Sequence, residues 1–382
     1  MDIEEIIGFD ALYNSMNKCV KGVLWKDGTA AFYHNWIREI LRLEKQLKTG
    51  TYKERPAKFF TITEPKTREI MSIAFRDRVY QRSLNDVAIY PATTRSFIYD
   101  NHACQKGKGT DKARNRLKCH LQRYYRKHGA DGYVLQCDIK GYYPNMRHDV
   151  AKRVLRKYLD DGPYQMAADI LDNFPGDVGF NPGSQIVQIV GITALNDMDH
   201  YIKEVLRIAF YIRYMDDFIL ISDSLEELEK ALECIKSILK DMEMELNETK
   251  TRIYKLSEGI PFLGFIFRLI DTGKVVVNIK PEKVKHERRK LRRMVELVRK
   301  GEKAREKVDE HFESWKRSAS YGNNFKMLQR MDTYYRSLWE AYDNEIQKTD
   351  LDHRGGKETG EQCGEDRAAG GSDRVCRDNG GH

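Results

Sequence analysis

The chain has 382 residues, of which 41% are hydrophobic and 32% charged, so it is long enough for two or three domains with real cores. Its net charge of +8 favours a polyanionic partner such as a nucleic acid. The seven cysteines contain no CxxC pair, which gives no support to a zinc site and is typical of reduced thiols. The acidic N-terminus and the lack of any long apolar stretch indicate no signal peptide and no membrane span, and we expect a cytoplasmic protein.

The first third of the chain is predicted to be mostly helical. Residues 1–50 form this helical part, and Ala30–Leu47 is expected to be one helix because its apolar residues recur at helical spacing: Phe32, Trp36, Ile40 and Leu43. The run Phe59–Thr63 predicts a strand. A basic segment, Lys66–Asn85, follows and ends in an amphipathic helix.

The middle of the chain predicts strands that end at aspartates. The apolar run Tyr133–Cys137 leads directly into Asp138. Two further runs, Phe210–Tyr214 and Phe218–Ser222, flank Met215-Asp216-Asp217, which is the pattern of a hairpin with a carboxylate pair at its turn. Helices are expected at Asp149–Tyr158, Gln188–Leu206 and Leu225–Met242. Phe262–Phe267 predicts one strand, followed by a hairpin through Asp271–Gly273.

The C-terminal part is basic and helical. Lys283–Lys300 holds nine Lys or Arg residues, and its apolar residues fit one helix face. A second helix is expected over Asn324–Ile346. The polar, Gly-rich end of the chain is predicted to be disordered.

The aspartates are the strongest chemical signal in the sequence. Two adjacent carboxylates at a hairpin turn repel each other and persist most readily when a cation neutralises them. Asp216 and Asp217, with Asp138 at the end of another strand, supply three oxygen-ligand donors suited to Mg²⁺. Two such ions about 3.5–4 Å apart can activate a 3′-hydroxyl and stabilise a leaving pyrophosphate. A lone aspartate at a strand end would be only a turn former.

These motifs resemble those of reverse transcriptases. Tyr214-Met215-Asp216-Asp217 looks like the catalytic hairpin of that family, and Asp138-Ile139-Lys140-Gly141-Tyr142-Tyr143 resembles its other catalytic strand. The resemblance implies metal ligands at Asp138, Ile139, Asp216 and Asp217, two Mg²⁺ ions with Mn²⁺ as a substitute, and a nucleotide pocket lined by Tyr214 and Met215. Tyr143 would be the steric gate that favours deoxynucleotides. Ordinary core packing is the alternative role for Tyr143.

Further segments follow in the family's order. By resemblance, Lys66 and Arg68 would face the triphosphate, where cations offset charge on the transferring phosphate. Lys250 would be the general acid near the leaving group. Phe262, Leu263 and Gly264 resemble the primer grip. The alternatives are a solvated basic loop for the first pair and a buried strand for the last three residues.

One motif departs from the retroviral pattern. With Gly183 aligned to the motif glycine, Gln188 replaces the usual proline, so both residues are assigned to the nucleotide and template pocket by resemblance. A glutamine there is similar to the enzymes of diversity-generating retroelements and related bacterial types.

The resemblance implies an α+β right-hand polymerase, with an antiparallel palm sheet backed by helices and a helical thumb. The expected parts are a helical extension (1–50), fingers (51–132), palm (133–270), thumb (271–348) and disordered tail (349–382). The expected activity is RNA-directed DNA synthesis from dNTPs, with an RNA template, a DNA or RNA primer and an accessory protein as partners.

Several functions remain open at the level of sequence. The enzyme could serve a diversity-generating retroelement, phage defence or a retron. It could instead be a maturase-like RNA-binding scaffold, although the intact aspartate set argues against lost catalysis. An RNA-dependent RNA polymerase is disfavoured by the aromatic residue at Tyr143. The sequence shows no endonuclease motif and no RNase H set.

Overall fold

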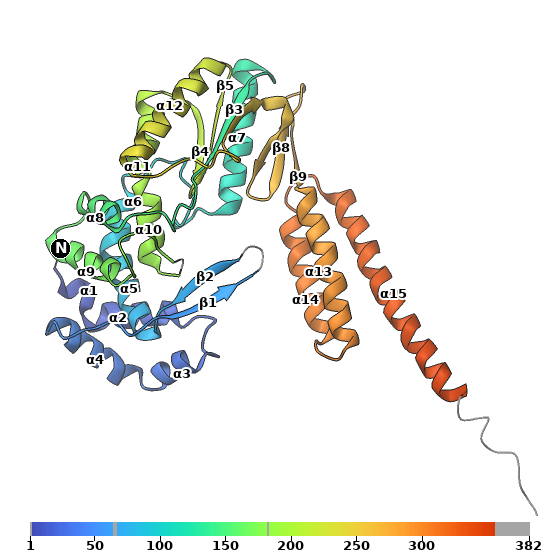
Figure 1. Cartoon of the computed structure of the whole chain (residues 1–382), viewed down its shortest axis with the longest axis horizontal. Coiled ribbons are helices and arrows are strands. Elements are labelled where there is room, and N and C mark those ends of the chain that lie inside the picture. The colour runs from blue at the N-terminus through green and yellow to red at the C-terminus, as the bar shows by residue number, and fades with distance from the viewer. Residues whose placement is uncertain (1, 64–66, 182, 356–382) are drawn as a thin grey trace, which may run out of the picture. The chain divides into compact units, whose positions relative to one another are not determined.

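The computed structural model describes residues 2–63, 67–181 and 183–355. It divides into two compact units, Met1–Asn278 and Ile279–His382, which are treated separately below (Figure 1). Lys66 and the end of the predicted disordered tail, residues 356–382, lie outside the described residues. No helix in the described part of the chain is long and apolar enough to span a membrane.

Four short helices begin the first unit: α1 (Glu4–Ile7), α2 (Phe9–Cys19), α3 (Asp27–His34) and α4 (Trp36–Lys48). The single helix predicted over Ala30–Leu47 is wrong, because Asn35 leaves helical geometry with φ −115° and ψ 25° and separates α3 from α4. The rings of Tyr13 and Trp36 pack 4.9 Å apart between their centroids. This aromatic contact helps to hold α2 against α4.

An antiparallel hairpin of β1 (Lys58–Ile62) and β2 (Arg68–Ser72) follows, and every residue of β1 is exposed (Figure 1). The strand predicted at Phe59–Thr63 is thus confirmed to within one residue. The chain then enters α5 (Phe75–Leu84), a π-helical turn (Asn85–Ile89) and α6 (Tyr90–Thr94).

The buried carboxylate of Asp77 ties α5 to the segment before β1. It accepts hydrogen bonds from the Tyr52 hydroxyl and the Arg55 backbone N–H, both at 2.9 Å. Because Asp77 is only 1% exposed, these bonds replace the water that its carboxylate would otherwise need.

A four-stranded antiparallel sheet of order β4-β5-β3-β6 lies at the centre of the first unit. Its strands are β3 (Tyr133–Asp138), β4 (Phe210–Tyr214), β5 (Asp217–Ser222) and β6 (Arg252–Lys255). The predicted strands at the aspartates are confirmed. Nearly all residues of β4 and β5 are buried, and since successive side chains point to opposite faces, both faces of these strands are covered.

Two long helices pack against this sheet (Figure 1). Helix α7 (Thr110–His128) contacts β4, and α12 (Leu225–Asp241) contacts β3 and β5. The Ser224 hydroxyl caps α12 by accepting the Glu227 backbone N–H at 3.2 Å. The helix predicted over Leu225–Met242 is confirmed.

Between β3 and β4 lie α8 (His148–Arg156), α9 (Asp161–Asp172), α10 (Gln185–Ala194), α11 (Asn196–His200) and a π-helical turn (Tyr201–Val205). The continuous helix predicted over Gln188–Leu206 is wrong, because Leu195 departs from helical geometry with φ −93° and ψ 8°. Helix α10 is almost wholly buried and supplies the packing surface beneath the residues after β3.

A second, three-stranded sheet has the order β7-β8-β9. Its strands are β7 (Ile260–Phe262), β8 (Phe265–Leu269) and β9 (Val275–Ile279). The single strand predicted over Phe262–Phe267 is wrong, because Leu263 and Gly264 form a turn with φ +44° and +89°. The hairpin predicted through Asp271–Gly273 is confirmed, with the Ile270 N–H bonded to the Lys274 carbonyl at 3.1 Å.

The second unit consists of α13 (Pro281–Arg299), α14 (Arg305–Ala319) and α15 (Phe325–Gly355). Helix α15 extends beyond the predicted end at Ile346, and α14 was not predicted. The three helices share a small core made of Leu291, Met294, Val295, Val308, Phe312, Met331 and Trp339. The basic helix predicted at Lys283–Lys300 is confirmed as α13.

Candidate active site

The β4–β5 hairpin turns through Met215 and Asp216. Tyr214 pairs with Asp217 across the hairpin, so the turn has only two central residues. Met215 has a φ of +58°, which is uncommon for a residue with a side chain. Such backbone strain costs about 1–3 kcal/mol and persists only where the surroundings hold it.

Arg213 holds this turn from behind. Its side chain is fully buried, and it donates to the Met215 carbonyl at 3.0 Å and to the Ile192 carbonyl at 2.9 Å. It also forms two hydrogen bonds with the buried carboxylate of Asp199, at 2.7 and 2.6 Å. Burial alone would favour the neutral guanidine, but the Asp199 carboxylate raises the pKa of Arg213 above its ordinary value. Sequence reasoning missed this pair, although one charge within an apolar strand was a signal for it.

Asp138 lies directly opposite Asp217 on the neighbouring strand, β3. The chain after α12 returns beside Asp138, where the Asn247 backbone N–H donates to the Asp138 carbonyl at 2.7 Å. The Thr251 hydroxyl accepts the Asp138 N–H at 3.4 Å. These bonds place Lys250, which lies between Asn247 and Thr251, next to the end of β3.

Lys250 forms an ion pair with Asp138, with 2.6 Å between Nζ and Oδ2. The Lys250 side chain is 49% exposed and that of Asp138 is 21% exposed, so solvent reaches the pair. The structure therefore brings a cation predicted only by resemblance into direct contact with one of the predicted carboxylates.

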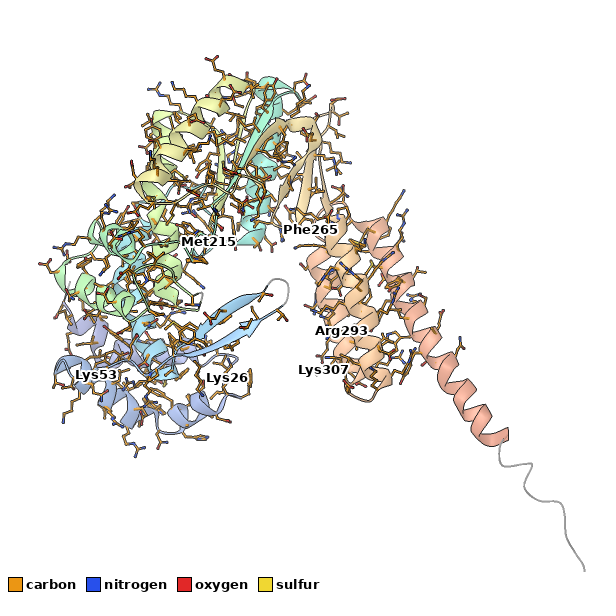
Figure 2. All side chains as sticks on the ribbon, in the orientation of Figure 1. Lys26, Lys53, Met215, Phe265, Arg293 and Lys307 are labelled. Carbon is orange, nitrogen blue, oxygen red and sulfur yellow. The ribbon has the colours of Figure 1, made fainter. Side chains whose placement is uncertain are left out.

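The three aspartates line one cavity of about 960 Å³. The cavity also receives Thr67 and Glu69 from the β1–β2 hairpin. In Figure 2, Met215 lies between the central sheet and that hairpin. Of the residues predicted for the site, the lining includes Asp138, Ile139, Tyr143, Tyr214, Met215, Asp216, Asp217, Lys250 and Leu263.

The Tyr143 ring borders this cavity and packs on α10 at Gly191. A Cβ at Gly191 would lie 2.7 Å from the Tyr143 hydroxyl oxygen, so only glycine permits this approach. The Tyr143 hydroxyl is buried without a hydrogen-bond partner, and burial raises the pKa of Tyr143 above its ordinary value. The neighbouring Tyr142 is different, because its hydroxyl donates to the Gly191 carbonyl at 2.5 Å.

Gly183 and Gln188 lie outside the lining of this cavity. Gly183 has a φ of +147°, and a Cβ there would meet the Met71 carbonyl at 2.4 Å, so the position requires glycine. Gln188 lines an adjacent cavity of about 420 Å³, which also includes Tyr214. Cys104 also lines the adjacent cavity, with its Sγ 3.9 Å from both Gln188 Oε1 and Met215 Sδ.

The β7–β8 turn contributes Leu263 to the cavity, whereas Phe262 is fully buried. Arg114 on α7 holds the turn by donating to the Leu263 carbonyl at 2.9 Å, and its guanidinium lies 4.5 Å from the centre of the Phe265 ring. Arg114 is a second residue that sequence reasoning missed. The adjoining Gly264 has positive φ.

Two cations, Lys66 and Arg68, were predicted to face the triphosphate. Lys66 lies outside the described residues, and for Arg68 only the backbone is described, paired with Ile62 in the hairpin. Thr67 and Glu69, which flank Arg68, line the cavity.

The donor set fits a hard divalent cation, because three carboxylates from adjacent strands line one solvent-reached cavity. The described residues contain no preassembled cluster of three metal-binding His, Cys, Asp or Glu side chains. The Lys250 ammonium neutralises the Asp138 carboxylate. The predicted metal ligands thus share a cavity without converging on one point.

Comparison with known proteins identifies the class of this molecule. Residues 63–267, which are 205 of the 382 residues, match the family described as "Reverse transcriptase (RNA-dependent DNA polymerase)". The match covers β2, the central sheet and the three aspartates. The fold is therefore that of a nucleic-acid polymerase.

The chain belongs to the reverse transcriptase family, whose members are RNA-directed DNA polymerases and hence nucleotidyltransferases. The predicted fold class is confirmed, and the central sheet is the palm. No curated protein matches the sequence.

Two solved structures are similar to the chain. An apo telomerase from Candida tropicalis, truncated from its C-terminal domain, shows 13% identity and a TM-score of 0.43 over 60% of this chain and 58% of that chain. A telomerase from Candida albicans, in complex with a fragment of telomeric RNA, shows 12% identity and a TM-score of 0.44 over 72% and 55%. The chain thus spans less than two thirds of either structure.

Proposed function

We propose that this protein is a reverse transcriptase that copies an RNA template into cDNA from dNTPs. The observation that carries the proposal is the placement of Asp138 directly opposite Asp217, with Asp216 in the adjoining turn and all three lining one cavity. Adjacent strands that present three carboxylates to a cavity of about 960 Å³ suit a nucleoside triphosphate with its metal ions.

Asp138, Asp216 and Asp217 would hold two Mg²⁺ ions, with Mn²⁺ as a substitute and the Ile139 carbonyl as a further ligand. When bound, these ions supply Lewis-acid activation of a 3′-hydroxyl and charge stabilisation for the leaving pyrophosphate. Arg213 supports this role because it fixes the carbonyl next to Asp216.

Other residues would position the substrates. Lys250 would protonate the leaving pyrophosphate, since a general acid must lie within reach of the reacting phosphates. Lys66 and Arg68 would contact the triphosphate. The β7–β8 turn at Phe262-Leu263-Gly264 would hold the primer end, and Leu263 in that turn already lines the cavity.

The longer segments of the chain would form the parts of a right-hand polymerase. Residues 51–132 would be the fingers, 133–270 the palm and 271–348 the thumb, after a helical extension at 1–50. The thumb proposal is supported by α13, where eight Lys or Arg residues outnumber three glutamates. Such cations bind phosphates without reading sequence.

The test measures dNTP incorporation on poly(rA)/oligo(dT) with Mg²⁺. The assay is run at neutral pH and moderate salt, as expected for a cytoplasmic protein. Intact protein should synthesise DNA, and Asp216→Ala/Asp217→Ala should not. A matched control is Asp223→Ala, which removes an exposed aspartate just beyond β5, outside the cavity lining. Synthesis by the double variant at the intact rate would refute the proposed metal site.

Tyr143 provides the observation that separates a DNA polymerase from an RNA polymerase. Its ring borders the cavity beside Asp216, as a steric gate against a 2′-hydroxyl requires. Tyr143→Ala should increase rNTP incorporation relative to dNTP, by about 10–100-fold if one small-group contact is lost. Tyr142→Phe is the control, because Tyr142 is buried and its hydroxyl contacts Gly191. An intact protein that prefers rNTPs would favour the RNA polymerase alternative.

We propose that the biological role is reverse transcription in a diversity-generating retroelement. The proposal is supported by Gln188, the residue that resembles those enzymes, which lines a pocket together with Tyr214. Such a system would include an accessory protein. Phage-defence and retron roles are the alternatives. A template repeat beside a variable gene in the neighbouring DNA would support diversification, and a neighbouring structured-RNA gene without such a repeat would favour a retron.

A maturase-like scaffold is the alternative from another functional class. Splicing assistance by the intact protein, together with no synthesis even on its native RNA and with its partner, would establish the scaffold instead of the polymerase.

A further inference from the structure

Helix α7 carries a concentration of positive charge that the polymerase site does not use. Its 19 residues contain seven Lys or Arg and a single acid, Asp111, for a net charge of +6, whereas the whole chain has a net charge of +8. Helix α12, which packs on the same palm sheet, contains three Lys and five acids and is net negative. Solubility alone would not require this asymmetry.

Two of the seven cations on α7 have internal roles. Arg114 bonds to Asp111 and to the Leu263 carbonyl, both at 2.9 Å. Arg116 forms an ion pair with the buried carboxylate of Asp100 at 2.5 Å. Although burial opposes ionisation, the hydrogen bonds from His120 and Arg116 lower the pKa of Asp100 below its ordinary range. These two arginines belong to the packing of the palm.

The other five cations on α7 are exposed, and none of them pairs with a carboxylate in the described part of the chain: Lys112, Lys118, Arg123, Arg126 and Lys127. At 100° per residue, Lys112, Arg123 and Arg126 fall on one face of the helix, and Lys118 and Lys127 flank it. The uncharged residues on this face are Asn115, Cys119 and Gln122. We call the five exposed cations the α7 basic face.

The α7 basic face leads away from the active site along the palm. At the start of the helix, Arg114 bonds to Leu263, which lines the active cavity. At its end, His128 pairs with Asp223, beyond the far end of β5, at 2.8 Å. From Lys112 to Arg126 the helix rises about 21 Å, at about 1.5 Å per residue. A polyanion on this face would therefore extend outward from the cavity.

We propose that the α7 basic face binds the phosphate backbone of RNA, at a segment of the template RNA that lies outside the reacting duplex. The ligand class rests on the proposed function, because an RNA template supplies the polyanion. Protein interfaces usually centre on exposed aromatic or apolar anchors. Among the described residues, the exposed large hydrophobic side chains include none on α7, which favours phosphate over a protein partner.

The test compares two variants that each remove three exposed cations from one palm helix. The first is Lys118→Gln/Arg123→Gln/Arg126→Gln on α7, and the control is Lys230→Gln/Lys236→Gln/Lys240→Gln on α12. The probe is a fluorescent RNA hairpin with a single-stranded tail, titrated at 50–200 mM KCl. Each lost phosphate contact should reduce the slope of log K against log [salt] by about 0.7–0.9, so we expect the α7 variant to lose about two to three units of slope. The α12 variant should bind like the intact protein.

Arg123→Lys/Arg126→Lys, which keeps the charge, should bind RNA within about twofold of the intact protein. Equal affinity and equal salt slope for the α7 glutamine variant and the intact protein would overturn the inference.

Synthesis on poly(rA)/oligo(dT) is measured on the same samples and separates the two proposals. An inactive intact protein with α7-dependent RNA binding would refute only the polymerase. An active protein whose RNA binding is unchanged in the α7 variant would refute only RNA binding by the α7 basic face.

Discussion

Arg213 and Asp199 form a fully buried ion pair directly behind the turn that carries Asp216. The guanidinium contacts both Asp199 oxygens, at 2.7 and 2.6 Å, and its remaining donors hold the Met215 and Ile192 carbonyls. The Tyr211 hydroxyl also donates to Asp199 at 2.6 Å. This network links α10, α11 and the β4–β5 hairpin.

Removing one partner of this pair should be strongly destabilising. Asp199→Ala leaves a buried guanidinium without its counter-ion, which typically costs about 3–5 kcal/mol of the free energy of unfolding. Urea unfolding of the variant should show a correspondingly lower midpoint. A midpoint equal to that of the intact protein would show that water or another group replaces Asp199.

The double variant Arg213→Met/Asp199→Leu separates stability from catalysis. Replacing both charges by apolar groups of similar size is often neutral for stability, so most of the loss should be recovered. Primer extension should stay low, because Met215 would lack the donor that holds its carbonyl. Extension at the intact rate by a stable double variant would contradict the positioning role of Arg213.

Lys250 is expected to act in chemistry rather than in folding. Solvent reaches its ion pair with Asp138, and such solvent-screened pairs stabilise proteins little, so Lys250→Ala should unfold like the intact protein. The rate of single-nucleotide incorporation should fall by about 10²–10⁴, the usual contribution of a general acid. Pre-steady-state quenched-flow measurements would detect this loss.

A dNTP analogue with a more acidic leaving group gives the control for Lys250. General-acid assistance matters less as the leaving group becomes more acidic, so the deficit of Lys250→Ala should shrink with such an analogue. A deficit of the same size with both substrates would assign Lys250 to binding instead.

Gly191→Ala should move the Tyr143 ring into the cavity that the three aspartates line. The new Cβ would lie 2.7 Å from the Tyr143 hydroxyl oxygen and 2.8 Å from its Cε1, so the ring must shift. We expect the KM for dNTPs to rise several-fold with little change in stability, because alanine also favours the helix by about 1 kcal/mol. Gly28→Ala on α3, where nothing lies within 4 Å of the new Cβ, is the control. An unchanged KM in Gly191→Ala would show that Tyr143 does not contact the bound nucleotide.

The protein should lose stability in mild acid through His102. This side chain is 2% exposed, and burial, followed by the charge of Lys108, lowers the pKa of His102 to about 4 from its ordinary value of 6.5. Between pH 6.5 and 4 the unfolded state binds the proton and the native state does not, so the free energy of unfolding falls as the pH falls. His200, whose pKa is raised, contributes in the opposite direction.

Urea unfolding at pH 7, 5.5 and 4.5 would measure this effect. His102→Gln should flatten the pH dependence by up to about 1.4 kcal/mol per pH unit. Parallel curves for the variant and the intact protein would exclude His102 as the cause.

The β4–β5 hairpin could be predicted because the pattern that specifies it is local in the sequence. Two apolar runs around Met215-Asp216-Asp217 define both strands and the turn, and the strand before Asp138 is equally clear. The breaks at Asn35 and Leu195 could not be predicted, because an apolar pattern can continue across a short interruption of the helix. The turn at Leu263 could not be predicted either, because the apolar residues continue through it from one strand to the next.

Contacts between distant parts of the chain were also beyond sequence reasoning. Asp199 and Arg213 carry no motif, and their pairing depends on how α11 packs behind β4. The contact between Lys250 and Asp138 depends on the chain after α12 returning beside β3. Residue types and spacing do not specify such long-range contacts, because the tertiary fold determines them.

The order of the palm strands also limits which changes in chain length the protein can tolerate. Asp138 is the last residue of β3 and Asp217 is the first residue of β5, and these two interior strands are each hydrogen-bonded on both sides. A one-residue insertion or deletion within either strand would turn the side chains on one side of the change to the opposite face of the sheet, and so move an aspartate relative to its partner. Natural length variation should therefore accumulate in exposed connections such as the one between α13 and α14, while the span from Tyr133 to Asp138 keeps its length.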